Sequence, residues 1–268
     1  MSKLDVTEEA MVEEYWRQWA YEGFPLEKRR LRQFFRFLPA DTRCRLCYAP
    51  FDKTAGTLVK TFLHVFPSRF NPHYCNACDD FANKHQGGAK VPVTMLFVDI
   101  RGSTTIAERM GEKEFSDLIN RFYVDSTTTL CHADAIIEKL VGDEVTAIFT
   151  RGTAGEEYPR KAVESAIELL KVTGHGNGSK ERIPIGIGIH SGEAFVGSVG
   201  KPNGLMEVAA LGDVPNTASR LTSLAAAGEI LVSEDTMLAA KMDTQGLEKR
   251  NLELKGRSKA IDAFVLHL

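Results

Sequence analysis

The chain has 268 residues, of which 43% are hydrophobic and 26% are charged, and its net charge is −3 at pH 7. This length suits one large or two modest domains, and the composition is that of an ordinary soluble globular protein. Residues 1–90 hold 14 Lys/Arg and 11 Asp/Glu (net +3), so they lack the strong basic charge of a nucleic-acid-binding domain. No apolar run reaches the roughly 18–20 residues of a membrane span, and the first residues lack a signal-peptide pattern. We therefore expect no transmembrane segment and a cytoplasmic location.

Two helices are predicted within residues 1–40. The first covers about 7–21, has aromatic residues at near-helical spacing, and is ended by Gly23 and Pro25. The second covers 26–38 and has Leu and Phe on one side and arginines largely elsewhere. A basic amphipathic helix can lie on an anionic membrane or pack against protein. We expect packing and a dimer contact, because the acidic first helix can neutralise the second.

Four of the five cysteines form two Cys-x-x-Cys pairs, Cys44 with Cys47 and Cys75 with Cys78, with 27 residues between the pairs. Two such pairs can complete a tetrahedral site of four thiolates, so a structural zinc ion in a zinc-ribbon-like module is predicted. An iron–sulfur cluster, a redox-active dithiol and four unrelated thiols are the alternatives. The stretch 57–66 between the pairs is strand-like, and the segment has few apolar residues, so we expect it to need a metal to fold.

Residues 91–105, VPVTMLFVDIRGSTT, combine an apolar run with a turn and a helix start. Asp99 stands where the apolar run ends. Gly102, Ser103 and Thr104 then offer a flexible backbone and a helix N-terminus, which can receive phosphate oxygens. An acid beside an anion-binding turn indicates a metal–phosphate site, although an Asp before a Gly-Ser turn is often a helix cap.

The rest of the chain mixes helix and strand patterns, which predicts an α+β fold. A linker is expected over 81–90, followed by a helix over 104–130 that is interrupted near Gly111, and Cys131 after it is expected to be a small buried hydrophobe. A β-hairpin over 136–149 should turn at Gly142-Asp143, and a helix over 158–172 should precede a second hairpin over 183–199. The last expected elements are a helix over 216–226, a strand over 229–232 and two C-terminal strands.

Four stretches share the motifs of a known family: VDIRGST, IIEKLVGDEVTAIF (136–149), IPIGIGIHSGEAFVGSVG (183–200) and ALGDVPNTASRLTSLAAAGEILVSEDT (210–236). In this order and spacing they closely resemble the class III nucleotidyl cyclase catalytic domain, which makes cyclic AMP or cyclic GMP. The resemblance covers about 91–268 and implies a ferredoxin-like domain with helices over a mainly antiparallel sheet. Residues 1–40 (helices) and 41–90 (zinc-ribbon-like module and linker) lie outside it.

The resemblance implies an adenylate cyclase-type phosphorus–oxygen lyase. Asp99 and Asp143 match the family's metal-binding aspartates, and the Ile100 carbonyl matches a further ligand of two Mg²⁺ or Mn²⁺ ions per active site. Two such ions suit this reaction, because one can activate the ribose 3′-hydroxyl while the other grips the phosphates. Asn216 and Arg220, four residues apart on one helical face, match the pair that positions the ribose and stabilises the transition state.

The residues at the positions that would select the base match the family only in part. Lys139 matches the family's adenine-reading lysine, which favours ATP as the substrate, and Lys255 resembles a lysine that contacts the triphosphate. The usual partner of the first lysine is replaced by Ala209, which has no side-chain hydrogen bond to offer, so rejection of other bases is weakened. A pyrimidine (CTP/UTP) cyclase of bacterial antiphage signalling and a guanylate cyclase are therefore alternatives.

An alternative of a different class is an inactive cyclase-like sensing or dimerisation module. Against it, none of the four residues Asp99, Asp143, Asn216 and Arg220 is lost. The resemblance also implies a homodimer, because in the family the two aspartates come from one chain and the lysine and the Asn–Arg pair from the other. A regulatory protein partner could act through residues 1–90.

Overall fold

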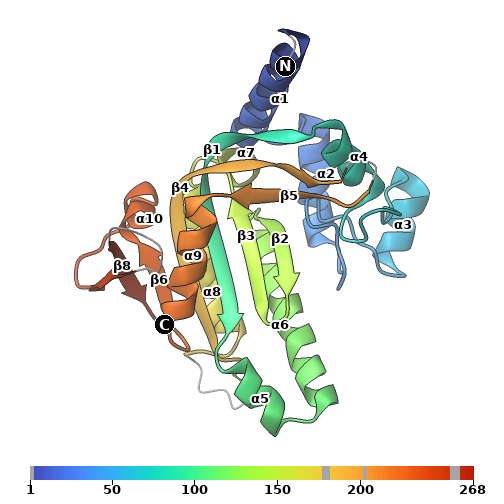
Figure 1. Ribbon diagram of the computed structural model, residues 1–268. Coiled ribbons are helices and arrows are strands. Elements are labelled where there is room, and N and C mark those ends of the chain that lie inside the picture. The colour runs from blue at the N-terminus through green and yellow to red at the C-terminus, as the bar shows by residue number, and fades with distance from the viewer. Residues whose placement is uncertain (1–2, 177–181, 202–203, 254–259) are drawn as a thin grey trace. The chain divides into compact units, whose positions relative to one another are not determined.

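The computed structural model describes residues 3–176, 182–201, 204–253 and 260–268, and in these ranges four helices precede a region of mixed strands and helices (Figure 1). The helices are α1 (Lys3–Glu22), α2 (Leu26–Phe37), α3 (Ala55–Leu63), α4 (Asn76–Lys84), α5 (Ser103–Arg109), α6 (Glu112–His132), α7 (Arg151–Ala154), α8 (Tyr158–Val172), α9 (Asp213–Leu224) and α10 (Glu234–Ala239). The strands are β1 (Gly87–Ile100), β2 (Ile136–Val141), β3 (Glu144–Phe149), β4 (Ile185–Gly200), β5 (Met206–Leu211), β6 (Ile230–Ser233), β7 (Glu248–Leu252) and β8 (Ile261–Leu266). Within the described ranges, every helix is too short or too polar to cross a membrane.

The chain divides into two compact units. Unit 1 contains residues 1–91, 151–153 and 194–211, and unit 2 contains residues 92–150, 154–193 and 212–268. The boundaries fall inside β1 and β4, so each of these long strands contributes to both units. Unit 1 therefore combines the N-terminal helices and the cysteine pairs with the β4–β5 hairpin.

The strands form an eight-stranded sheet in the order β2-β3-β1-β4-β6-β8-β7, and β5 pairs with β4 off this path. The ladders β1–β3, β2–β3, β4–β5, β6–β8 and β7–β8 are antiparallel, whereas β4–β6 is parallel. The predicted α+β class with helices over a mainly antiparallel sheet is thus confirmed.

The alternating Ile-Gly residues of β4 determine how α9 packs in unit 2. A side chain at Gly188 would collide with the backbone of Thr222, and one at Gly186 would press on the Ala225 carbonyl, so the two glycines let α9 approach the strand closely. Because side chains alternate along a strand, the buried Ile187 and Ile189 point to the opposite face. That face is covered by α6 and α8 (Figure 1).

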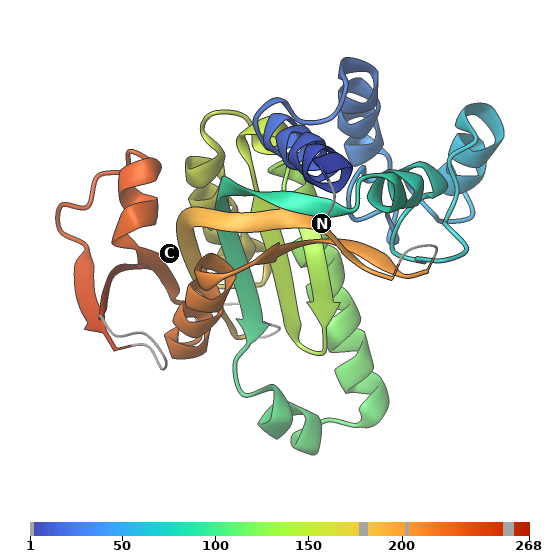
Figure 2. The same cartoon turned by 45° about the horizontal axis from the view of Figure 1, so that its top comes forward.

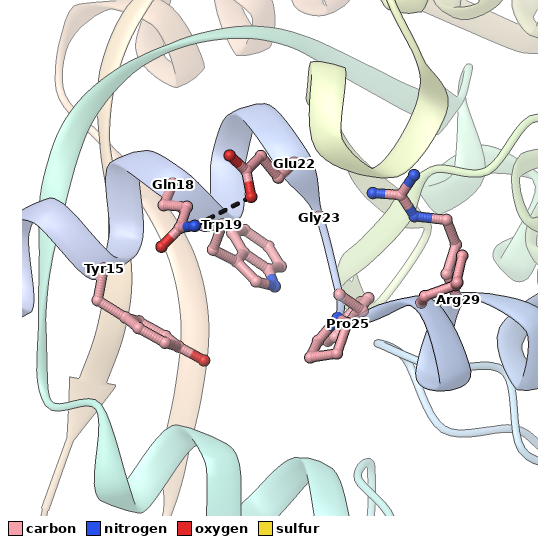
Figure 3. Close-up of a pocket in the computed structure, with 9 residues that line it drawn as sticks. Tyr15, Gln18, Trp19, Glu22, Gly23, Pro25 and Arg29 are labelled. Carbon is pink, nitrogen blue, oxygen red and sulfur yellow. Dashed lines mark hydrogen bonds between the residues drawn. The ribbon is translucent and has the colours of Figure 1, made fainter.

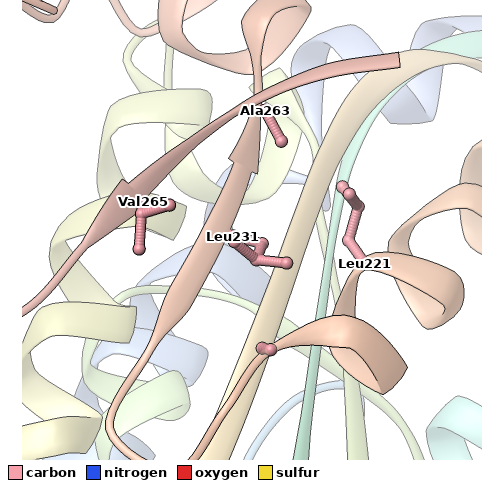
Figure 4. Close-up of a cluster of buried hydrophobic side chains, with 5 residues drawn as sticks. Leu221, Leu231, Ala263 and Val265 are labelled. Atoms are coloured by element: carbon pink, nitrogen blue, oxygen red, sulfur yellow. The ribbon is translucent and has the colours of Figure 1, made fainter. Parts of the chain in front are cut away.

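A cluster of buried apolar side chains joins α9 to the C-terminal strands of unit 2. Figure 4 shows Leu221 of α9, Leu231 of β6, and Ala263 and Val265 of β8 gathered in this cluster, which also contains Ala225. Leu221 and Leu231 have no exposed surface. Full burial of such side chains contributes roughly 1.5–3 kcal/mol each, so this cluster fixes α9 on the sheet.

In unit 1, α1 and α2 meet at a tight turn at Gly23, which has a φ of 76°. Trp19 and Phe24 contact one another edge to face with ring centroids 5.6 Å apart, and the indole N–H of Trp16 donates to the carbonyl of His85 at 3.0 Å. A cavity of about 380 Å³ lies between the two helices (Figure 3). The Gln18–Glu22 hydrogen bond, at 3.0 Å, lies at its edge.

The structure confirms most of the predicted elements of the cyclase-like region. The hairpin predicted over 136–149 is β2–β3, and Gly142, with a φ of 60°, forms its turn. The helix over 158–172 is α8, the interruption near Gly111 separates α5 from α6, and Cys131 is buried. The strand near 229–232 and the two C-terminal strands are β6, β7 and β8.

The prediction of strand-like structure over 57–66 was wrong, because Ala55–Leu63 forms the helix α3. The Asp52 carboxylate accepts hydrogen bonds from the N–H groups of Thr54 (2.9 Å) and Gly56 (3.1 Å), and thus satisfies free donors at the start of the helix. Phe62 is 76% exposed, so the apolar residues that suggested a buried strand largely face solvent.

Two further boundaries differ from the prediction. The expected linker over 81–90 is instead the end of α4 and the beginning of β1. The expected hairpin over 183–199 is one continuous strand, β4, whose antiparallel partner is β5. The chain does not turn at Gly192; this glycine instead makes room for the side chain of Val214.

Candidate functional site

The predicted metal ligands lie at one end of the β1–β3 ladder. Asp99 is paired in register with Glu144, and the N–H of Ile100 donates to the carbonyl of Asp143 at 3.1 Å. The tight turn at Gly142 is held by the hydroxyl of Tyr123, which donates to the Gly142 carbonyl at 2.7 Å. The β-ladder therefore brings together two acidic positions that are far apart in the sequence.

Arg101 links this acidic end to helix α9. Its guanidinium forms an ion pair with Asp99 and donates to the carbonyl of Thr222 at 3.2 Å, in the last turn of α9. A cation at a helix C-terminus is favourable because it compensates the free carbonyl groups there. Burial lowers the pKa of Arg101, whereas the carboxylates of Asp143 and Glu144 act in the opposite direction. Sequence reasoning missed this residue, although it lies inside the quoted DIRGST motif.

Glu144 adds a third carboxylate to the same end of the ladder. Burial is the main cause that raises its pKa, the neighbouring Asp143 raises it further, and Arg101 and Lys139 oppose the shift. Carboxylate and carbonyl oxygens are the ligands that Mg²⁺ and Mn²⁺ prefer. Asp99, Asp143 and the backbone at Ile100 therefore fit a site for divalent cations. The sequence signal for Glu144 was its place directly after Asp143 in the GDE turn.

The predicted phosphate-binding turn follows directly. Gly102 has a φ of 69° and precedes the first residue of α5, and the positions of Ser103 and Thr104 are the first two of that helix. Lys139 is exposed on β2, opposite Thr146 of β3. Lys255 lies outside the described residues.

Asn216 and Arg220 share one face of α9. Asn216 is exposed and Arg220 is half-buried, whereas Ala218 and Leu221 are buried toward the sheet. Among the described residues, no hydrogen bond or ion pair connects Asn216 or Arg220 to the aspartates. Ala209 is buried in β5 and therefore belongs to unit 1.

The four cysteines of the two Cys-x-x-Cys pairs are brought together in unit 1, and their sulfur atoms all lie within 4.8 Å of one another. The sulfurs of Cys47 and Cys75 are 3.6 Å apart, which is well beyond the roughly 2.05 Å of a disulfide bond. A tetrahedral ion with metal–sulfur distances near 2.3 Å separates its sulfur ligands by about 3.8 Å. The cluster thus has the size of a site for a single metal ion.

The four thiols shift one another's pKa: hydrogen bonding with Cys44 is the largest cause that raises the pKa of Cys47 and of Cys78 well above the ordinary value. Burial raises the pKa of Cys44, but hydrogen bonds from the other three cysteines outweigh it and hold the pKa well below the ordinary value. Arg32 of α2 lies over the ring of Tyr48 at 4.2 Å and donates to the carbonyl of Leu46 at 3.0 Å. The prediction that the basic helix packs against protein is therefore confirmed within unit 1, while its role in a dimer stays a prediction.

Residues 87–267 match the family model of the adenylate and guanylate cyclase catalytic domain. A terminal-differentiation-specific adenylate cyclase of Dictyostelium discoideum is 29% identical over 180 residues, which are 64% of this chain and 8% of that protein. An adenylate cyclase of Anabaena cylindrica is 27% identical over 64% of this chain and 36% of the relative. The chain thus spans well under half the length of these curated relatives.

Solved structures agree with the family match. The guanylyl cyclase Cya2 superposes with a TM-score of 0.59 and 26% identity, over 67% of this chain and 93% of that one. The adenylyl cyclase CyaB from P. aeruginosa gives a TM-score of 0.58 and 27% identity, over 68% and 96% of the two chains. With the family model covering most of its length, this chain belongs to the adenylate and guanylate cyclase catalytic domain family.

Proposed function

We propose that this protein is a nucleotidyl cyclase that converts ATP to 3′,5′-cyclic AMP and pyrophosphate. The observation that carries the proposal is the junction of β1 with the β2–β3 hairpin, where the hydrogen bond from Ile100 to Asp143 brings the two acidic positions together. Family membership supports the reaction class, and the adenylate cyclases among the relatives favour ATP.

The carboxylates of Asp99 and Asp143 would hold two divalent cations. When bound, Mg²⁺ or Mn²⁺ assists deprotonation of the ribose 3′-hydroxyl and neutralises charge on the phosphates. The guanidinium of Arg101 pairs with Asp99, so it would share this carboxylate with a bound cation. The backbone of residues 102–104 would receive phosphate oxygens at the start of α5.

The second half of each active site would come from a second copy of the chain. Asn216 and Arg220 lie on the side of α9 away from the sheet, where a partner chain can approach them. Arg220 would stabilise the charge that develops on the phosphorus centre, and Asn216 would orient the ribose. A head-to-tail, two-fold homodimer with two identical sites follows, and Lys139 would serve the site opposite to that of Asp143 on the same hairpin.

Mixing two inactive variants tests this arrangement. Asp99→Ala and Arg220→Ala chains should each be inactive, but a mixed dimer would contain one site with all its groups and one site lacking both. Random pairing of equal amounts makes half of the dimers mixed, so activity should recover to roughly a quarter of wild type if the sites act independently. No recovery, once sedimentation has shown that mixed dimers form, would mean that each chain builds its own site.

Lys139 favours ATP, but Ala209 cannot supply a second hydrogen bond to the base. The decisive assay offers ATP, GTP, CTP and UTP separately with Mn²⁺ and resolves the products by mass. Cyclic AMP as the main product supports the proposal. Cyclic CMP or cyclic UMP would identify a pyrimidine cyclase, and cyclic GMP a guanylate cyclase. The absence of every cyclic product would favour the inactive sensing or dimerisation module.

For the cysteine cluster we propose one structural Zn²⁺ per chain. The support is the spacing of the sulfur atoms, which fits a single tetrahedral ion, and the burial of Cys44, Cys75 and Cys78. Elemental analysis of the purified protein decides the identity of the metal. One zinc per chain is expected, whereas iron with inorganic sulfide would replace the zinc assignment by an iron–sulfur cluster.

A further inference from the structure

The outer edge of β5 is covered by two side chains instead of another strand. β5 pairs with β4 along one edge, which leaves backbone groups on its other edge to be satisfied. The amide of Asn71 donates to the carbonyl of Met206 at 2.8 Å, and the N–H of Val208 donates to the hydroxyl of Tyr74 at 2.9 Å. Residues two apart in a strand present their backbone groups to the same edge, so the two hydrogen bonds act side by side.

Both side chains belong to the loop that leads into the second cysteine pair. Asn71 has no exposed surface and Tyr74 is 2% exposed, so water has little access to replace either hydrogen bond. The backbone conformation of this loop is fixed locally, because the N–H of Tyr74 donates to the carbonyl of Asn71 at 3.1 Å. The loop therefore connects the cysteine cluster to β5 through buried hydrogen bonds.

The first cysteine pair holds the same loop from the other side. The N–H of Arg45 donates to the carbonyl of His73 at 3.0 Å, and the N–H of Cys75 donates to the sulfur of Cys44 at 3.3 Å. These bonds join the two pairs at the residues that flank Tyr74. A metal ion that ties Cys44 to Cys75 thus also sets the position of the Tyr74 side chain.

A second connection reaches the β4 strand of the same hairpin. Cys78 lies in α4, and the carbonyl of Ala82 in that helix accepts a hydrogen bond from the hydroxyl of Ser198 at 2.7 Å. Figure 2 shows α4 beside the β4–β5 hairpin. The hairpin is therefore attached to the cysteine module at both of its strands.

We propose that the metal ion of the cysteine cluster positions the β4–β5 hairpin through Asn71 and Tyr74, and that metal loading thereby sets how well the cyclase binds its nucleotide. The link to the nucleotide rests on the proposed function, because Ala209, at the position assigned to base selection, directly follows Val208. Asn71 and Tyr74 are positioning residues: they act on β5 and not on the substrate. Removing one partner leaves a buried backbone group without a hydrogen bond, so each change should be felt in the strand.

The test compares two isosteric variants in the same module. Tyr74→Phe removes the acceptor of the Val208 N–H, whereas Tyr48→Phe removes a buried hydroxyl that accepts a hydrogen bond from Arg32 of α2. Metal content is measured for both, and both should retain one metal per chain. Amide hydrogen exchange over 206–211 is then measured without nucleotide or added Mg²⁺.

In Tyr74→Phe we expect the Val208 amide to exchange about tenfold faster, while Tyr48→Phe leaves that amide unchanged. Stripping the metal from the wild type should speed exchange over 206–211 at least as much. In the stripped Tyr74→Phe protein the two effects should not add fully, because they break the same connection. The KM for the triphosphate should rise about tenfold in Tyr74→Phe with less than a twofold change in kcat.

Unchanged exchange over 206–211 after complete removal of the metal would overturn the proposal. An equal response of Val208 to Tyr48→Phe would also overturn it, since the effect would then be general loosening of the module. If hydrogen exchange changes as expected but the wild type cyclises no triphosphate, the proposed function is wrong, whereas the connection between the cysteine cluster and the β4–β5 hairpin is supported. If the wild type is active and the KM of Tyr74→Phe is unchanged, the connection has no role in nucleotide binding.

Discussion

Unit 1 and unit 2 bury their apolar side chains to different extents. In unit 2, Leu221 and Leu231 are fully buried between α9 and the sheet, and no phenylalanine of the described residues in this unit is exposed. In unit 1, Phe37 is 71% exposed, and Phe34, Phe62 and Phe70 are exposed as well. Unit 1 nevertheless buries Trp16 and Phe35 almost completely, so a metal ion in the cysteine cluster would add to the stability that this aromatic core provides.

The long strand β4 is supported by a different kind of interaction in each unit. In unit 2 the β4 strand is held by close packing of α9 over Gly186 and Gly188. In unit 1 the same strand continues into a hairpin held by hydrogen bonds from Asn71, Tyr74 and Ser198. We therefore expect unit 1 to respond to metal removal and unit 2 to respond to changes in its apolar core.

The largest effect is expected for Cys44→Ser, which removes a metal ligand. The variant should lose its metal and destabilise unit 1 by an amount of the order of 10 kcal/mol, because metal binding contributes directly to folding in such modules. Both tryptophans of the chain, Trp16 and Trp19, lie in unit 1, so the unfolding transition followed by tryptophan fluorescence reports on this unit. The control is Cys131→Ser in α6, which should retain the metal. Full metal content in Cys44→Ser would contradict the assignment.

Asp143→Asn should reduce cyclase turnover by about 1000-fold, or roughly 4 kcal/mol in the barrier, because an amide cannot replace a carboxylate ligand of the catalytic cations. The tryptophan transition and the metal content of unit 1 should not change, since the substitution lies in the β2–β3 turn of unit 2. Asp117→Asn on the exposed face of α6 is the matched control and should keep full turnover. Turnover above a few per cent of wild type at saturating Mn²⁺ would remove Asp143 from the site.

Leu231→Ala should destabilise unit 2 by about 3 kcal/mol, because it opens a cavity in a fully buried cluster. Hydrogen exchange in β6 and β8 measures this loss, and metal content should stay at the wild-type value. Leu238→Ala, at a position that is 71% exposed, is the control and should change stability by less than about 0.5 kcal/mol. If the tryptophan transition of Leu231→Ala showed the same loss of stability as hydrogen exchange in β6 and β8, the two units would unfold together.

The smallest effect is expected for Glu229→Gln, about 1 kcal/mol at pH 7. Arg250 donates to both carboxylate oxygens of Glu229, at 2.8 and 3.0 Å, and these bonds are the main cause that lowers the pKa of Glu229. Since the folded-state pKa lies below the unfolded value, the stabilisation is present above the unfolded pKa and is lost as the pH falls through the folded one. The difference between wild type and Glu229→Gln in urea unfolding should therefore shrink below about pH 4.

Glu164→Gln is the control for that measurement. Glu164 pairs with Arg160 on the surface of α8, and its side chain is 59% exposed, so the variant should be indistinguishable from wild type. A difference between Glu229→Gln and wild type that grows toward low pH would have the opposite sign from that required by a lowered carboxyl pKa.

Elements whose signals are local could be predicted from the residues alone. The apolar run that ends at Asp99, the Gly142-Asp143 turn, the period of α8 and the paired cysteines were all readable, because each depends on neighbours a few residues away. The order and spacing of the motifs then determined the family. The candidate carboxylates were predicted from these motifs, and the structure adds that the β1–β3 register brings their positions together.

Features that depend on residues distant in the chain became visible in the folded molecule. Residues 57–63 of the stretch that looked strand-like are helical, and Asp52 satisfies the first N–H groups of that helix. The β5 strand belongs with the cysteine module because Asn71 and Tyr74, more than 130 residues earlier in the chain, bind its free edge. No periodicity encodes such a pairing: the hydrogen-bonding groups of an edge strand are backbone atoms that every sequence carries, and only the fold determines which side chains reach them.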